Sequence, residues 1–405
     1  MNRGSVTSFT VATVIMMLLY VMPQAVLFIR NDLLAIIATI YYVLFVRKYV
    51  SPSVLISTLL IAFPYLFLYG INGFWGNLKY GFVLPFMTLL TLVMPCFAMI
   101  AIVKRNNLRE QKVILIVTAL SLGYVAINTL IALATNPLIM RDLTGTTDGS
   151  FYVMTRMRGV GGYGIAYSMG ALFIAFWVTR KYISDSFIHP VVYYTLMIGS
   201  ALLIVQSQFG TLLFITIGGI ALYYFIETKS FLQKLLVLSV TIVVIVLSKS
   251  LISLGMTMLE GEVIRYKFEL IYDSIWGGGG AENISGERSQ VQLEAYRLFL
   301  QSPIFGYNGF INLDAYKSAH STIISVMAAS GIIGLFSYLA MFYSVIRRIL
   351  TCCFSLKEEK RLYYPVILFY LSFAFLNPID FTFECSWIIF FVIPLLYYVV
   401  FNKVK

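Results

Sequence analysis

Runs of about 20 apolar residues recur along the whole chain, and they constrain its fold more than any other feature. A helix of that length crosses the roughly 30 Å hydrocarbon core of a bilayer. A transmembrane β-barrel would instead show short segments of alternating apolar and polar residues. Charged residues make up 12% of the chain, against about 25% in soluble proteins. We therefore expect an all-α polytopic membrane helical bundle, a single integral membrane domain over residues 1–405.

The apolar runs divide into twelve candidate transmembrane segments. The first is too long and too evenly apolar for a cleaved signal peptide, so we expect it to be retained as a helix. The second is the shortest. The segments cover residues 8–29, 33–46, 53–70, 81–103, 113–135, 159–179, 190–206, 210–226, 233–254, 321–346, 363–378 and 386–401.

Basic residues predict how these segments are oriented. Most of the 29 lysines and arginines fall in alternate connections, which identifies those connections as the cytoplasmic ones. The remaining basic residues are concentrated in two long loops, 136–158 and 255–320, and long loops obey this rule less strictly. We therefore expect both termini in the cytoplasm and both long loops outside, where they carry the candidate active site.

The second outer loop, residues 255–320, contains segments that are expected to form amphipathic helices. Residues 261–276 place apolar side chains on one helical stripe, and four glycines at 277–280 follow as a break. A second amphipathic helix is expected from Ser285 to about Gln301, because Ser285 is a suitable N-cap and Pro303 marks a stop. Both helices would lie on the outer membrane surface with the apolar side down.

His320 ends this loop and is one of two histidines in the chain. A neutral imidazole can accept a proton near neutral pH, so a histidine at a membrane surface is suited to water-side chemistry. Histidine also occurs at such boundaries simply to cap or pack a helix. The residue taken by itself leaves both interpretations open.

Four ordered motifs connect the loop to the helix that follows it. They are Gly286-Glu287-Arg288, Pro303-Ile304-Phe305-Gly306-Tyr307-Asn308-Gly309, His320-Ser321 and Gly331-Ile332-Ile333-Gly334. In this order they resemble the O-antigen polymerase and O-antigen ligase superfamily. In that superfamily a loop arginine precedes a glycine turn, and a histidine opens the next helix ahead of a G-x-x-G motif. The resemblance covers residues 286–334, and the multi-span layout agrees with it.

Two further patches resemble the same superfamily but depart from its pattern. Arg158-Gly159-Val160-Gly161-Gly162-Tyr163 is similar to an arginine and glycines ahead of an earlier helix, without the usual Pro-Asn. Gln208 stands where an arginine is common, and Ala329 or Ser330 stands where an acidic residue is common. These departures leave the polymerase and ligase branches undecided.

The resemblance implies transfer of a sugar from a polyprenyl-pyrophosphate donor to a sugar hydroxyl. The attacking hydroxyl needs a base, and His320 is the candidate catalytic residue. The pyrophosphate needs fixed positive charge, which a planar guanidinium supplies in paired hydrogen bonds. Any one outer arginine could instead contact a lipid headgroup or a surface carboxylate. The candidate pyrophosphate-binding residues are Arg288 and Arg158, followed by Arg156, Arg265 and Arg297.

We expect neither a cofactor nor a metal. Glu260 and Glu262 are the only closely spaced carboxylates of the outer loops, and Glu-x-Glu is a weak metal pattern. A sugar-nucleotide transferase would typically show an Asp-x-Asp site in a sizeable soluble domain, and the sequence has neither. Arginine and histidine suffice in principle to activate the reaction.

The expected function is that of a Wzy-type polysaccharide polymerase, a glycosyltransferase on the outer face of the bacterial cytoplasmic membrane. A ligase that moves finished glycan to another acceptor is the close alternative. A lipid-linked oligosaccharide flippase is the alternative from another class, but its spans should carry deep cationic residues, and here only Lys249 qualifies.

The expected partners are polyprenyl-pyrophosphate-linked oligosaccharide and membrane lipid, and a chain-length regulator and a flippase could work alongside. The net charge of +11 follows from the cytoplasmic bias of basic residues and needs no nucleic acid to explain it.

Overall fold

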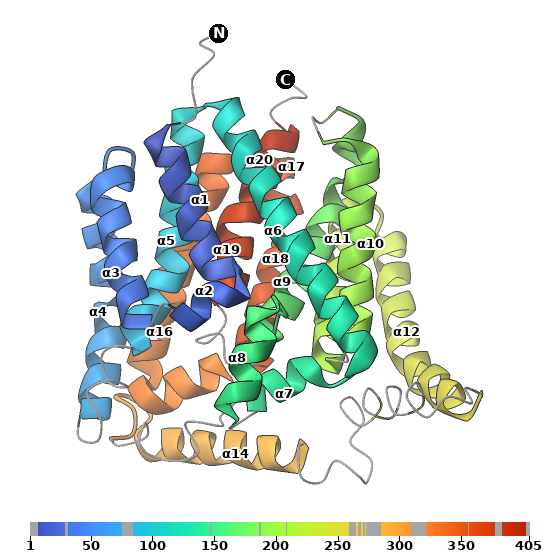
Figure 1. The fold of residues 1–405 in the computed structure, drawn as a ribbon. Coiled ribbons are helices and arrows are strands. Elements are labelled where there is room, and N and C mark those ends of the chain that lie inside the picture. The colour runs from blue at the N-terminus through green and yellow to red at the C-terminus, as the bar shows by residue number, and fades with distance from the viewer. Residues whose placement is uncertain are drawn as a thin grey trace.

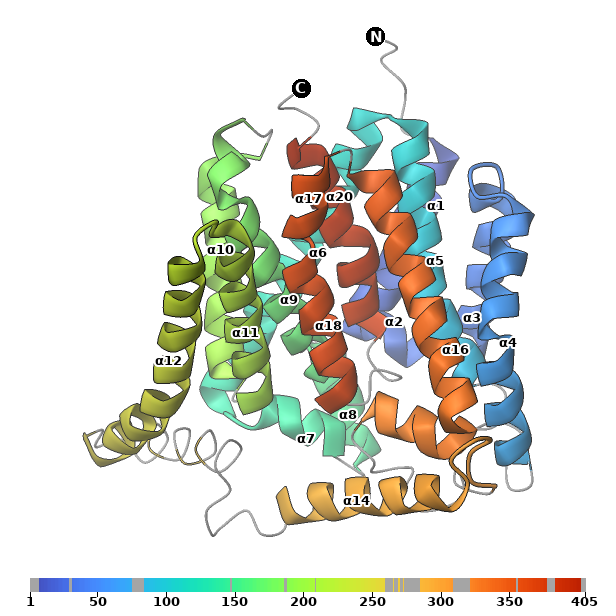
Figure 2. The same cartoon turned by 180° about the vertical axis from the view of Figure 1, so that it is seen from behind.

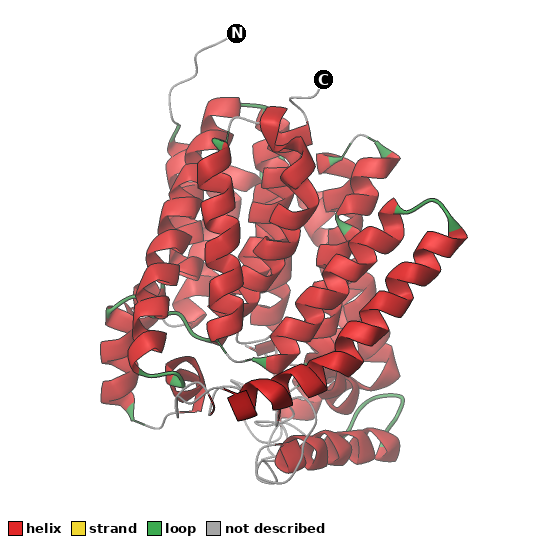
Figure 3. Cartoon of the chain, turned by 90° about the vertical axis from the view of Figure 1, so that its right-hand side faces the viewer, coloured by secondary structure: helices red, strands yellow, loops and turns green. Residues whose placement is uncertain are grey.

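The computed structural model is a bundle of helices packed side by side (Figures 1 and 3). It describes residues 7–28, 31–74, 84–145, 148–185, 188–207, 209–258, 265, 269, 272, 285–308, 321–354, 356–376 and 383–401. None of these residues lies in a strand, in agreement with the all-α fold expected from the sequence.

Each of the twelve predicted segments contains a helix or consecutive helices. The first segment is divided because Pro23, which fits the first turn of a helix but not its interior, begins a new one. The helices are α1 (Ser8–Val21), α2 (Pro23–Phe28), α3 (Asn31–Tyr41) with a π-helical extension (Tyr42–Val46), α4 (Pro52–Phe74), α5 (Leu84–Arg105), α6 (Leu108–Thr135), α9 (Tyr163–Thr179), α10 (Pro190–Gln206), α11 (Gly210–Glu227), α12 (Phe231–Met258), α16 (Thr322–Cys353), α17 (Lys357–Leu362), α18 (Tyr364–Leu376), and α19 (Phe383–Trp387) continued by a π-helix (Ile388–Val392) and α20 (Ile393–Phe401).

Length and composition identify five helices in the described part of the chain that could cross a membrane. Large apolar side chains also cover the outside of the bundle: Leu60, Leu120 and Phe336 expose 68%, 69% and 65% of their surface. Such an exterior suits lipid rather than water. The protein is therefore an all-α membrane protein. The five helices are Pro52–Asn72, Leu108–Thr135, Gly210–Glu227, Thr322–Cys353 and Glu384–Phe401.

The last predicted segment forms the core of the bundle. From Glu384 to Phe401, 94% of the residues are buried, and Trp387 has no exposed surface. Trp387 packs against Tyr20 of α1 with ring centroids 5.2 Å apart, and α19 also contacts α5 and α9. Glu384 places an acidic side chain at the beginning of this buried helix, where an unpaired carboxylate is energetically costly.

The connections gather at the two ends of the bundle. α1 begins and α20 ends at one end, and α7 (Ile139–Gly145), α8 (Gly149–Met157) and α14 (Ser285–Gln301) lie at the opposite end (Figures 1 and 2). The described parts of the two long loops therefore share one end, as charge placement predicted. The end with α7, α8 and α14 is called the loop end below.

The helix predicted from Ser285 to about Gln301 is confirmed as α14, which runs across the loop end (Figure 2). Ala295 and Phe299 of this helix are buried, as expected for the apolar side of an amphipathic helix, and α14 contacts α16. The helix predicted over 261–276 lies outside the described residues except at three positions.

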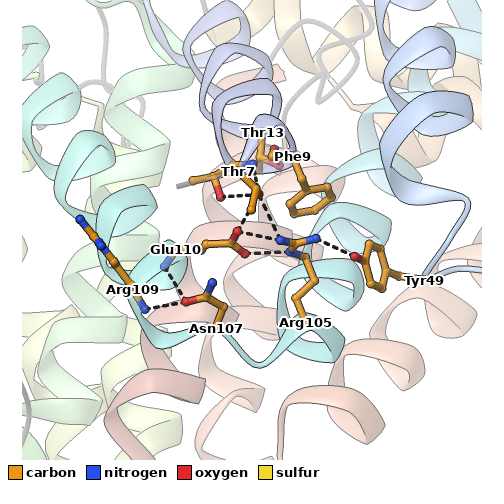
Figure 4. Close-up of polar contacts among 9 residues, drawn as sticks. Thr7, Phe9, Thr13, Tyr49, Arg105, Asn107, Arg109 and Glu110 are labelled. Carbon is orange, nitrogen blue, oxygen red and sulfur yellow. Dashed lines mark hydrogen bonds and ion pairs between the residues drawn. The ribbon is translucent and has the colours of Figure 1, made fainter. Parts of the chain in front are cut away.

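A closed polar cluster ties α1, α5 and α6 together at the end opposite the loop end (Figure 4). Arg105 donates from Nε to Glu110 Oε2 and from Nη2 to Glu110 Oε1, both at 2.7 Å. Its Nη1 donates to the Tyr49 hydroxyl at 2.6 Å, and Thr7 donates to Glu110 at 2.6 Å. Both carboxylate oxygens and all three guanidinium nitrogens have partners, so this partly buried ion pair is structural.

Candidate functional site

A glycine-rich turn joins α8 to α9 at the loop end (Figures 1 and 2). Gly159 adopts a φ of +80°, and a β-carbon there would come within 2.6 Å of the Tyr124 ring. The N–H of Gly161 donates to Thr129 Oγ1 at 2.8 Å. Tyr124 and Thr129 both belong to α6, so the turn is held against that helix.

α9 begins directly after this turn without a side-chain cap. Its N-cap is Gly162, which has no side chain to accept hydrogen bonds from the first turn. The first turn of a helix presents backbone N–H groups and the positive end of the helix dipole. Such an end binds phosphate or carboxylate groups well when another group completes the site.

The side chain of Arg156, from the last turn of α8, completes the site. It is only 8% exposed, and its Nε and Nη1 are buried without a hydrogen-bond partner. Its Nη2 passes close to Gly162, where a β-carbon would lie 2.8 Å from that nitrogen. The guanidinium carbon lies 5.4 Å from the centroid of the Tyr152 ring. A buried cation with unused donors is costly until an anion binds, so the position suits an oxyanion.

Glu384 faces the same turn from the first turn of α19. It is 7% exposed, and its Oε2 lies so close to Gly164 that a β-carbon there would overlap it. Arg156 lies against Gly162 and Glu384 against Gly164, so the two side chains flank the first turn of α9. Both residues are described, and no ion pair joins them.

The arrangement of Arg156 and Glu384 differs from that of the ion pair between Arg105 and Glu110. The same two residue types are joined there by two hydrogen bonds of 2.7 Å, and here they stand apart around a glycine turn. A pair that only stabilised the fold would gain from direct contact. The separated arrangement instead leaves guanidinium donors available for a ligand.

A second glycine-dependent feature forms at the loop end, where the turn after α14 locks into a break in α16. Gly331 interrupts α16 with φ +65° and ψ −168°. The N–H of Ile332 donates to Pro303 O at 2.8 Å, and the N–H of Tyr307 donates to Ala328 O at 2.7 Å. A β-carbon on Gly306 or on Gly331 would overlap backbone atoms of the other segment. Gly306 and Gly331, which belong to the motifs before and after His320, therefore pack against each other.

Asn72 of α4 joins both sides of this lock. Its Nδ2 donates to Phe305 O at 2.8 Å and to Ala329 O at 2.7 Å. The break also reorients the first segment of α16, which runs across the loop end before the helix turns into the bundle (Figures 1 and 2). Segment 321–346, predicted as one continuous helix, is thus two helical segments joined at Gly331.

Replacing Gly331 with alanine should destabilise the protein by about 2–4 kcal/mol, because a positive φ and an overlapping β-carbon act together. The measurement is the melting temperature of the purified protein in detergent. Gly123→Ala in α6 is the matched control: a β-carbon there meets nothing within 4 Å, and we expect no loss. Equal melting temperatures for Gly331→Ala and the wild type would contradict the lock.

The candidate arginines predicted from the sequence lie in different surroundings. Arg156 is buried at the start of α9, whereas Arg158, two residues later, is exposed. Arg297 is exposed on α14. Arg265 is exposed and pairs with Glu269 at 3.1 Å, a surface pair one helical turn apart. Of these four, Arg156 alone combines burial with unused donors.

The remaining two candidates fall on or beside residues that the structure leaves out. Arg288 belongs to the first turn of α14, and its side chain lies outside the described residues. His320 also lies outside them, as do Glu260 and Glu262. Ser321, which follows His320, is buried and caps α16 by accepting from the N–H of Ile324 at 3.2 Å. The catalytic role of His320 stays a prediction.

Sequence reasoning missed Glu384 and Asn72. Glu384 had a usable signal, because an acidic residue beside an apolar membrane segment is costly and commonly functional. Asn72 had none, since its role depends on two carbonyls more than 200 residues away in the chain.

No protein-family model matches this chain, and no curated protein matches its sequence. Among the described residues, no cluster of three or more histidine, cysteine or acidic side chains could hold a metal ion.

Proposed function

We propose that this protein is a membrane glycosyltransferase that polymerises polyprenyl-pyrophosphate-linked oligosaccharide repeat units. The observation that carries the proposal is the buried, unpartnered guanidinium of Arg156 at the uncapped beginning of α9. Fixed positive charge with free N–H donors suits the pyrophosphate of a lipid-linked donor. The ordered motifs of residues 286–334, which resemble the O-antigen polymerase and ligase superfamily, support the same chemistry.

The proposed reaction divides its work between two groups. His320 accepts the proton of an acceptor sugar hydroxyl while that oxygen forms a bond to the anomeric carbon of the donor sugar. The bond from the anomeric carbon to the pyrophosphate oxygen breaks, and Arg156 stabilises the negative charge that collects on the leaving pyrophosphate. Arg158, Arg288, Arg265 and Arg297 remain candidates for holding other donor phosphate oxygens.

The proposed orientation has twelve membrane crossings, both termini in the cytoplasm of a bacterial cell, and the loop end outside. Bilayer-spanning segments and the placement of basic residues support it. A lipid-linked donor in the outer leaflet would then lie on the same side of the membrane as Arg156.

Thiol labelling tests this orientation. In a background where Cys352 is serine, Ser150→Cys and Glu294→Cys should react with a membrane-impermeant reagent on intact cells, since both positions are exposed at the loop end. Lys357→Cys, exposed on α17 near the opposite end, should react only after permeabilisation. Labelling of Lys357→Cys from outside would reverse the orientation.

The test of the activity is incubation of the purified protein with lipid-linked repeat units, followed by size separation of the glycans. A ladder of lengthening products is expected. A single transfer to a different acceptor would favour a ligase. Failure to form any covalent product, with substrate moved across a vesicle membrane, would overturn the proposal in favour of a flippase.

A further inference from the structure

An apolar groove lies between α11 and α12, which pack together at the edge of the bundle (Figures 1 and 2). It has a volume of about 360 Å³ and is partly open to the exterior. Its walls include Ile217 and Ala221 of α11 and Val240 and Val244 of α12. The hydroxyl of Thr241, which also lines it, donates to a backbone carbonyl of α12 at 2.7 Å. The walls therefore offer mainly hydrocarbon contacts, which suit an acyl chain.

Three cations gather where α11 ends and α12 begins. Tyr224 lines the groove, and its hydroxyl accepts a hydrogen bond from Arg180 Nη2 at 3.1 Å. Lys234 lies in the first turn of α12, with its Nζ 5.2 Å from the centroid of the Phe225 ring. Lys229 is exposed in the short connection between the two helices. This end of the groove lies away from the loop end (Figure 2).

These three charges are not neutralised by neighbouring carboxylates. Lys181 forms an ion pair with Glu227 at the end of α11. Among the side chains that the structure describes, no carboxylate pairs with Arg180, Lys229 or Lys234. Basic residues beside an apolar surface at a membrane boundary attract anionic lipid headgroups. An anionic phospholipid carries both the charge and the hydrocarbon that this site would take.

Charge also argues against a second copy of the chain as the occupant of the groove. A two-fold symmetric contact presents the same surface from both partners. Such a contact through α11 and α12 would bring Arg180, Lys229 and Lys234 close to their own copies, and like charges repel. A phospholipid has no such penalty, because its phosphate is attracted to all three cations.

We propose that the groove between α11 and α12 binds an acyl chain of an anionic phospholipid, whose phosphate contacts Arg180, Lys229 and Lys234. The lipid would hold α12 against the edge of the bundle. The site is separate from the proposed donor site, because Arg156 lies at the loop end and these cations lie away from it (Figure 2). The inference therefore does not rest on the proposed function.

Native mass spectrometry of the purified full-length protein, titrated with dioleoyl phosphatidylglycerol or dioleoyl phosphatidylcholine, tests the headgroup contact. The wild type should bind phosphatidylglycerol more tightly than phosphatidylcholine. The double variant Lys229→Gln/Lys234→Gln should lose about 10-fold in phosphatidylglycerol affinity and keep its phosphatidylcholine affinity. Lys48→Gln/Arg109→Gln removes two exposed cations elsewhere on the same end of the bundle, so this matched control should bind both lipids as the wild type does.

The same titration tests the acyl-chain contact. Ala221→Phe and Val240→Phe narrow the groove from opposite walls while every cation is kept. Each should weaken phosphatidylglycerol binding about 10-fold, because part of the chain loses its apolar contacts. Val246→Phe changes a residue of α12 that is 64% exposed and does not line the groove, so it should have no effect. Either phenylalanine variant decides the question, provided its melting temperature shows that it is folded.

Three results would overturn the inference. Equal binding of the two lipids by the wild type, or full phosphatidylglycerol affinity in the lysine double variant, would remove the headgroup contact. Unchanged binding in a folded phenylalanine variant would remove the acyl chain from the groove. A wild-type dimer that both phenylalanine variants convert to a monomer, with lipid binding unchanged, would assign the groove to a second copy of the chain.

Discussion

Replacing Arg156 with alanine is expected to slow sugar transfer about 100- to 1,000-fold, the usual effect of removing one donor that stabilises a developing oxyanion. The guanidinium is buried and has two unused donors, so its charge acts at short range in surroundings with little water. Arg156→Lys should recover part of the rate, because it keeps the charge and loses the paired donors. The measurement is the initial rate of product-ladder formation by the purified variants.

Two controls make this result specific to the site. Arg109→Ala removes an exposed arginine at the end of the bundle opposite the loop end and should leave the rate unchanged. The melting temperature of Arg156→Ala should stay close to that of the wild type, because no hydrogen bond is lost from Nε or Nη1. A near-normal rate in a well-folded Arg156→Ala protein would remove Arg156 from the mechanism.

His320→Ala should reduce polymer formation about 100- to 10,000-fold while donor binding persists, as is typical for loss of a general base. The helix that follows His320 should still form, since its cap is the buried Ser321. The wild-type rate should fall as the pH is lowered, because a protonated imidazole cannot accept the proton of the acceptor. That acidic limb should be missing from the residual activity of the variant.

The second histidine provides the matched control. His189 caps α10, where its Nδ1 accepts from the N–H of Val191 at 3.3 Å, and His189→Ala should keep normal activity. Loss of donor binding in His320→Ala would make His320 a binding residue instead of a base. Intact polymerisation would leave it as an interfacial histidine.

The sequence predicted the helices well because apolar length and stop signals are local properties. The segment 190–206 coincides with α10, and Ser285 to Gln301 coincides with α14. The break in α16 could not be predicted in this way. G-x-x-G alone is compatible with a continuous helix, and the non-helical Gly331 packs against the Gly306 turn, a contact that the sequence does not reveal.

The candidate site was predicted in part. Residue types and motif order selected five arginines, but burial distinguishes Arg156 from its neighbour Arg158, and burial depends on how α8 meets α9 and α19. The glycine motif begins at Arg158, so the sequence alone favours Arg158 over Arg156. Glu384 was missed because its partner is distant in sequence, although its position at the edge of an apolar segment was a usable signal.

The most direct measurement is an experimental structure of the protein with a bound polyprenyl pyrophosphate. The phosphate oxygens should accept hydrogen bonds from Arg156 Nε and Nη1 at about 2.7–2.9 Å and should lie at the beginning of α9. A pyrophosphate bound elsewhere, with both donors of Arg156 still unpartnered, would contradict the account.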